Sequence, residues 1–243
     1  GDYNVAVGKS ALSTDTKGLR SVAIGQSALH AQNFTTSISS YNTAVGDGAG
    51  LSVTTGINNT IMGGLAGDAI TDADDNLAVG YTALGSNLLG SRNTALGAYA
   101  FETLNPATAA QMYNTAVGYA AGNVITTGTS NTFVGSLAGD GTDDGVQNVA
   151  VGYAALSANC GNANTAVGPE CLTACTGANN TGLGKDAGVS VTSGDNNILL
   201  GYQAGVTGSP GGAISTADNI LVIGDENIAT ANIQVDWTVA SDA

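Results

Sequence analysis

A five-residue phrase, N-T-A-V-G, recurs along this chain and restricts its fold more than any other feature. The stretches YNTAVGDGAG (41–50), YNTAVGYAAG (113–122) and NVAVGYAAL (148–156) are near copies of one another. With the glycine as origin there are thirteen copies, spaced by 17, 21, 17, 17, 17, 21, 17, 17, 16, 16, 17 and 23 residues. These glycines are Gly8, Gly25, Gly46, Gly63, Gly80, Gly97, Gly118, Gly135, Gly152, Gly168, Gly184, Gly201 and Gly224. A short, nearly constant period predicts a solenoid, in which each unit contacts only its neighbours.

Each copy contains a run of Thr, Val, Ala and Ile that ends at the glycine, which is typical of a short strand followed by a turn. A second short apolar patch follows, and we expect a second strand-like piece there. Helix is disfavoured because a glycine every few residues costs roughly 1 kcal/mol each inside a helix. The sequence therefore predicts an all-β fold, a parallel β-solenoid or β-roll of about thirteen coils. Coils ~4.8 Å apart would make a rod about 58 Å long.

Asparagine stands four residues before the glycine in eleven of the thirteen copies. In-register coils would stack these side chains into a ladder, each amide bonding the next. We therefore assign the column a structural role. The expected ladder comprises Asn42, Asn59, Asn76, Asn93, Asn114, Asn131, Asn148, Asn164, Asn180 and Asn197.

The strand pattern is apolar on both faces. The residue before the glycine is large and apolar, the one before that is usually Ala, and neighbours in a strand point to opposite faces. Strands apolar on both faces are usually buried on both. We expect one face to fill the coil's own core and the Ala-lined face to pack against another chain, so that the protein is an oligomer.

Composition narrows the function classes. Five Lys and Arg against 19 Asp and Glu give a net charge of −14, which excludes the basic stripe of a nucleic-acid binder. No apolar run approaches the ~18 residues of a membrane span, so we expect no membrane insertion. One His, no Cys-x-x-Cys pair and no phosphate-binding glycine loop argue against catalytic residues, metals and cofactors, and we predict none.

The repeat N-T-A-V-G-x-x-A-L, as at residues 93–101 where Phe101 closes it, resembles the head repeat of trimeric autotransporter adhesins. That repeat is similar to N-S-V-A-I-G-x-x-S/A, and it also occurs in bacteriophage tail fibres. The resemblance covers residues 1–228 and implies a left-handed β-roll packed as a homotrimer. The chain departs from the adhesin type in its longer period, mostly 17 residues.

Residues 229–243 break the repeat and are expected to form a C-terminal strand that leads to a further domain beyond this chain. The closing Ser-Asp-Ala (241–243) resembles the opening of the S-D-x-R motif of self-cleaving intramolecular chaperone domains in phage tail fibres and tailspikes. The resemblance maps the self-cleaving residue onto Ser241 and its neighbour onto Asp242. The alternative is an ordinary terminal strand and tail.

Two long turns, 30–41 and 102–113, each carry four extra residues and recur four coils apart. We expect them to project from one flank of the rod, roughly 19 Å apart, and loops on a rigid scaffold often bind partners. The alternative is that they seal gaps between chains. The candidate binding residues are Asn33, Phe34, Thr35, Asn105, Pro106 and Thr108.

Three further groups of residues, which are aspartates, threonines and cysteines, have a possible role besides a purely structural one. Asp-rich turns supply the oxygen ligands that calcium prefers, although solvated turns are the simpler interpretation. Seven threonines three residues before the glycine form either an ice-binding array or a buried column mixed with aliphatic residues. Cys160 and Cys175 lie in equivalent turns of adjacent coils, where a disulfide is geometrically possible. The aspartates are Asp72, Asp74 and Asp75, and Asp140, Asp143 and Asp144 in the duplicate turn.

Taken with the resemblance, these features imply a structural and adhesive segment of a trimeric phage tail fibre, located on the virion. Its partners would be two copies of itself and a host cell-surface receptor, a glycan or an outer-membrane component. The alternative is the head of a bacterial trimeric adhesin on the cell surface. An enzyme such as a glycan-cleaving tailspike is disfavoured because the sequence offers no pair of carboxylates at a recognisable spacing.

Overall fold

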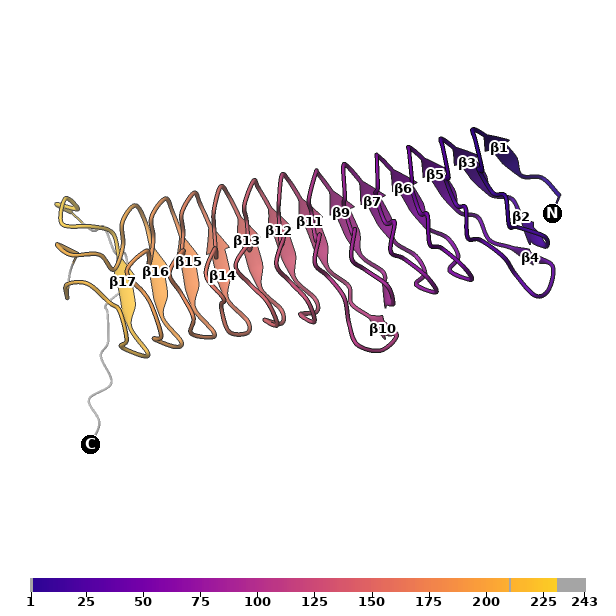
Figure 1. The fold of residues 1–243 in the computed structure, drawn as a ribbon. Coiled ribbons are helices and arrows are strands. Elements are labelled where there is room, and N and C mark those ends of the chain that lie inside the picture. The colour runs from indigo at the N-terminus through magenta and orange to yellow at the C-terminus, as the bar shows by residue number, and fades with distance from the viewer. Residues whose placement is uncertain (1, 210, 231–243) are drawn as a thin grey trace.

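The protein is a long rod of stacked coils (Figure 1). The computed structural model describes residues 2–209 and 211–230. Within them there is no helix, and thirteen short strands form one parallel sheet that runs the length of the rod. Thirteen strands joined in order make about twelve complete turns, slightly fewer than the coils expected. The predicted all-β parallel solenoid is confirmed.

The strands of the main sheet are three residues long and end directly before the repeat glycine. They are β1 (Val5–Val7), β3 (Val22–Ile24), β5 (Thr43–Val45), β6 (Thr60–Met62), β7 (Leu77–Val79), β9 (Thr94–Leu96), β11 (Thr115–Val117), β12 (Thr132–Val134), β13 (Val149–Val151), β14 (Thr165–Val167), β15 (Thr181–Leu183), β16 (Ile198–Leu200) and β17 (Leu221–Ile223).

Strand pairing follows the repeat without a slip, so equivalent residues of successive copies lie side by side. For example, Thr115 pairs with Thr132 and Val117 with Val134. Copies of 21 residues keep this register because their extra residues loop out of the sheet. Each long turn adds a two-residue pair, β2 (Gly18–Leu19) with β4 (Ile38–Ser39) and β8 (Gly90–Ser91) with β10 (Ala110–Gln111). Both loops project toward the lower side of the rod in Figure 1.

The expected second strand after each glycine is wrong, because that segment is a tight turn. The backbone there adopts the left-handed conformation twice, two and four residues after the glycine. In one coil these residues are Tyr99 (φ 61°) and Phe101 (φ 50°). Such angles are incompatible with an extended strand. The turn sends the chain back along the opposite wall of a narrow coil.

The repeat glycine is required by both conformation and space. Gly118 has a φ of 138°, and a Cβ there would lie 2.4 Å from the carbonyl oxygen of Gly135 in the next coil. The same contact recurs between Gly46 and Gly63 at 2.4 Å. The glycines thus form a stacked column along the corner of the rod, and a side chain at these sites would push neighbouring coils apart.

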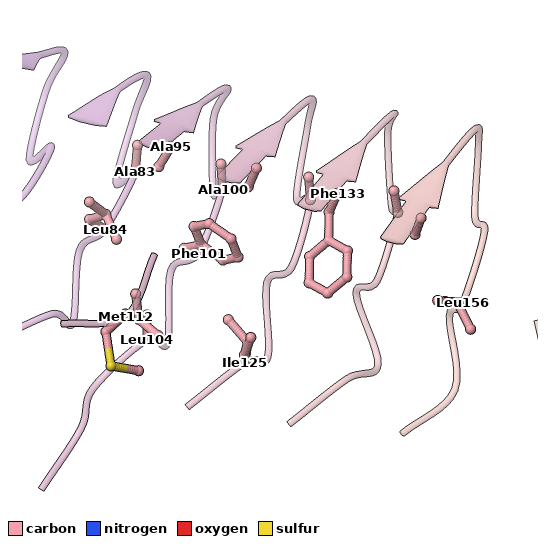
Figure 2. Packing of buried hydrophobic residues seen from close by; sticks show 14 of the residues in the cluster. Ala83, Leu84, Ala95, Ala100, Phe101, Leu104, Met112, Ile125, Phe133 and Leu156 are labelled. Carbon is pink, nitrogen blue, oxygen red and sulfur yellow. The ribbon is translucent and has the colours of Figure 1, made fainter. Parts of the chain in front are cut away.

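The core lies between the strand wall and the returning wall, and its width changes across the coil (Figure 2). Alanines such as Ala95 and Ala100 occupy the narrow end beside the glycine turn, and larger side chains such as Phe101 lie further in. Both alanines are fully buried within one chain. The prediction that the Ala-lined face packs against another chain is therefore wrong. The converging walls leave room for small side chains only, so alanine faces inward.

Side-chain volume is balanced between the two walls. Phe133 replaces the usual inward Ala of its strand, and the residues facing it, Gly122 and Gly139, have no side chain. A Cβ on Gly139 would lie 2.6 Å from the Phe133 ring. Ile61 lies in the same way against Gly50 and Gly67. The residue four places after the repeat glycine is thus Gly where it faces a large inward side chain and a large residue where it faces Ala.

The repeat extends through β17, and the described chain continues to residue 230. Of the expected C-terminal strand at 229–243, only residues 229 and 230 are described. Ser241 and Asp242 lie outside the described residues.

Candidate functional site

The outer face of the main sheet carries exposed apolar side chains along the described chain. Because the middle residue of each strand points inward, the first and third residues point outward. Leu96 is 43% exposed, Leu183 52% and Met62 46%. Two columns of aliphatic and threonine side chains, half-buried or exposed in the single chain, therefore run the length of the rod.

The threonines three residues before the glycine belong to this outer face and are half-buried or exposed in the single chain. Thr60 is exposed, whereas Thr43, Thr94, Thr115, Thr132, Thr165 and Thr181 are half-buried. Val, Leu and Ile interrupt them along the sheet in runs of at most three threonines, so the threonine array is discontinuous. We expected this threonine column to be buried, but a single chain does not bury it.

The asparagine column is buried and follows one bonding pattern. The side-chain oxygen of Asn114 accepts the backbone N–H of Asn131 at 2.9 Å, and its nitrogen donates to the Gly128 carbonyl at 2.8 Å. The first bond joins successive coils and the second closes the coil that carries the residue. The expected amide-to-amide bonding is thus replaced by side-chain-to-backbone bonds, with one amide pair between Asn93 and Asn76 at 3.2 Å. All ten ladder residues are at most 2% exposed: Asn42, Asn59, Asn76, Asn93, Asn114, Asn131, Asn148, Asn164, Asn180 and Asn197.

Two departures from this bonding pattern coincide with the two long loops. Ser21 replaces asparagine in the coil that carries loop 30–41, and its hydroxyl bonds with Ser40 at 2.5 Å. Asn93 starts the coil that carries loop 102–113, and its nitrogen bonds to Asn76 and to the Ser91 carbonyl at 3.3 Å. In both coils the usual acceptor position, fourteen residues on, falls within the long loop, so the Ser21 and Asn93 side chains bond elsewhere.

The residue before the asparagine forms a second ladder, on the surface. The Arg20 guanidinium lies over the rings of Tyr3 at 5.8 Å and Tyr41 at 5.7 Å. Arg92 lies over Tyr113 at 5.6 Å and pairs with Asp75 at 3.6 Å. These cations are therefore engaged in holding adjacent coils in register.

The six candidate binding residues in the long loops separate into two groups. Phe34 and Pro106 are buried and pack inside their loops. Asn33, Thr35, Asn105 and Thr108 are exposed. The side-chain oxygen of Asn33 accepts the Thr16 hydroxyl of the preceding coil at 2.9 Å. The exposed four are thus available to a partner, but they surround no cavity that the structure describes.

The Asp-rich turns are occupied by hydrogen bonds between coils. Asp72 accepts the hydroxyls of Thr54 at 2.7 Å and Thr55 at 2.8 Å, and Asp74 accepts the N–H of Ile57 at 2.8 Å. In the duplicate turn Asp143 accepts the Thr126 hydroxyl. Across the described ranges, no three His, Cys, Asp or Glu side chains are grouped closely enough to hold a metal ion.

All three cysteines are free thiols and buried, so Cys160 and Cys175 are not bridged. Burial raises the pKa of the Cys171 thiol to about 12 and that of Cys175 to about 11. Cys160 bonds with the Thr142 hydroxyl at 3.1 Å, and Cys175 accepts from Asn180 at 3.3 Å. The thiols act as small core side chains.

A hollow of about 340 Å³ lies on the flank beyond the glycine corner, and the sequence did not indicate it. One side is formed by Tyr99, Tyr119 and Leu137, and the other by Glu102, Asn123 and Asp140. The two tyrosine rings meet edge to face, with centroids 5.6 Å apart. Burial raises the pKa of the Asp140 carboxyl above its ordinary value. A signal exists in the repeat alignment, where Ala120 stands between Tyr99 and Leu137 in one column.

Comparisons with protein-family models, with curated proteins and with solved structures find no match for this chain. No helix within the described ranges has the length and apolar character needed to cross a membrane.

Proposed function

We propose that this chain is the shaft of a trimeric fibre of the bacteriophage tail-fibre type, displayed on the virion and contributing to attachment to a host cell surface. The observation that carries the proposal is the uncovered outer face of the thirteen-stranded sheet. Parallel sheets are normally covered on both faces, and large exposed apolar patches mark interfaces. Here the coil covers one face, and the other presents Leu96, Leu183 and Met62 to the outside.

Sister chains are the best-fitting cover because the face repeats along the whole rod. A second copy offers the same columns at the same spacing, so each contact made at one coil recurs at the next. The number three comes from the resemblance to trimeric adhesin repeats and phage fibres, as does the left-handed winding.

The strong negative charge agrees with a rod whose remaining surface stays in water. A net charge of −14 favours solubility and opposes non-specific clustering. Partners other than sister chains would be a host receptor, either a glycan or an outer-membrane component. The second candidate is the head of a bacterial surface adhesin of the same fold, which the repeat favours equally.

Sedimentation equilibrium of the purified chain tests the assembly. We expect a mass three times that of one chain, and Leu96→Lys to shift the protein toward monomer because a charge would be buried in the interface. Gln147→Lys is the matched control, since Gln147 is exposed and polar. A folded monomer at micromolar concentration would overturn the proposal. Peptides of this chain in purified virions would separate the fibre from the adhesin.

A further inference from the structure

The hollow beside Ala120 is built by two columns of the repeat. Two residues after each glycine, the successive side chains are Tyr99, Ala120 and Leu137, and the small middle residue leaves a gap between larger neighbours. Five residues after each glycine, the successive side chains are Glu102, Asn123 and Asp140, and they form the polar side of the gap. Rigid neighbouring coils therefore hold an aromatic side and an acidic side about the same space.

The polar side has hydrogen-bonding capacity that the protein does not use. Asn123 donates to Glu102 at 2.9 Å, which fixes the Glu102 carboxylate at the rim. The Asp140 Oδ1 atom is buried and accepts no hydrogen bond. A buried acceptor without a donor is costly, and functional sites are a common reason for one. Because the buried Oδ1 atom has almost no accessible surface, a ligand in the hollow could meet Asp140 only at the rest of its half-buried carboxylate.

The charge and shape restrict what such a ligand can be. Two carboxylates and no Lys or Arg line the hollow, so an anion is excluded. A neutral sugar would leave two carboxylates without a counter-charge. A protonated amine supplies both the charge and the N–H donors, and tyrosine rings attract ammonium groups. The volume of about 340 Å³ is at the small end of ligand sites, roughly 300–1,000 Å³.

We propose that this hollow binds the protonated amine of a small polar ligand, with the ammonium on the polar side lined by Glu102 and Asp140 and the carbon skeleton against Tyr99 and Tyr119. An amino sugar and an aminoalcohol headgroup share this chemistry. If the chain attaches to a host surface as proposed, this site would make amine-bearing molecules the class of receptor. That interpretation rests on the proposed function. Because all the lining residues named belong to one chain, binding itself does not depend on assembly.

Titration of the ¹⁵N-labelled full chain with glucosamine, followed by NMR shifts of Asn123 and its neighbours, tests the proposal. We expect saturable shifts around the hollow, and at least about tenfold weaker binding of N-acetylglucosamine, which lacks the charge. Ethanolamine binding as tightly as glucosamine would assign recognition to the ammonium group rather than to the sugar ring. Equal binding of glucosamine and N-acetylglucosamine would overturn the proposal.

Variants locate the site. Glu102→Gln and Asp140→Asn are each expected to weaken glucosamine binding about tenfold, because each removes a charged acceptor. Asp68→Asn is the matched control: Asp68 occupies the position of Asp140 in the duplicated block, and burial likewise raises the pKa of its carboxyl. Circular dichroism checks that each variant is folded. Unchanged binding in both hollow variants would reject the site even if sedimentation supports the fibre. A protein that binds glucosamine but sediments as a folded monomer would reject the fibre and keep the site.

Discussion

The side-chain oxygen of Asn180 accepts the backbone N–H of Asn197 at 3.0 Å, while its nitrogen donates to the Gly194 carbonyl at 2.8 Å. One amide thus closes its own coil and ties it to the next. A carboxylate cannot do both, because it has no donor for the glycine carbonyl.

Asn180→Asp is therefore expected to lower the free energy of unfolding by about 2–4 kcal/mol at pH 7, since it buries a charge facing a carbonyl. The loss should shrink in acid, where the carboxyl is protonated. Guanidinium unfolding measures the change. The neighbouring Asn179 is exposed, so Asn179→Asp should be within about 0.5 kcal/mol of the parent. Equal losses for the two variants would contradict the ladder.

Gly118→Ala should destabilise the rod by about 3 kcal/mol or more, because its Cβ would lie 2.4 Å from the Gly135 carbonyl oxygen at a φ of 138°. Gly64→Ala is the control, since a Cβ there meets its nearest atom, on Tyr81, at 3.7 Å. Thermal unfolding of the two variants should therefore differ clearly. A stable Gly118→Ala protein would show that adjacent coils can separate at the corner.

The three thiols should resist modification in the native protein. Burial raises the pKa of Cys171 to about 12 and of Cys175 to about 11, so little thiolate exists at pH 8, and the sulfur atoms are screened from reagents. Ellman's reagent should give no rapid reaction with the folded chain and three equivalents after unfolding. Rapid native reaction of one thiol would show that a coil opens locally.

Asp68→Asn should raise stability at neutral pH. Burial raises the pKa of Asp68 in the folded state above its ordinary value of 3.8, so the folded state holds its proton more tightly than the unfolded state. Stability from this group is therefore full below pH 3.8 and is lost as pH rises through the folded pKa. The melting temperature of the variant should exceed that of the parent at pH 7 and equal it near pH 3. A lower value at pH 7 would contradict the burial argument.

The thirteen copies of the repeat predicted the sheet, its register and the stacked asparagines, because equivalent residues of successive coils lie side by side in a solenoid. They did not reveal which apolar face turns inward. Ala95 and Leu96 are both apolar neighbours, and the choice between them depends on how closely the two walls approach. The hollow was missed for a similar reason, because Glu102 and Asp140 are 38 residues apart and come together only when coils stack.

By itself, the sequence determined the repeat unit, the parallel stacking and the positions where glycine and asparagine are required, because these follow from local geometry repeated at a regular period. The tertiary structure alone decided that the middle alanine of a strand lies inside and the large residue before the glycine outside, that the second apolar patch is a turn, and that Phe133 faces glycines. These outcomes depend on the width of the coil, a distance between segments that no single repeat specifies.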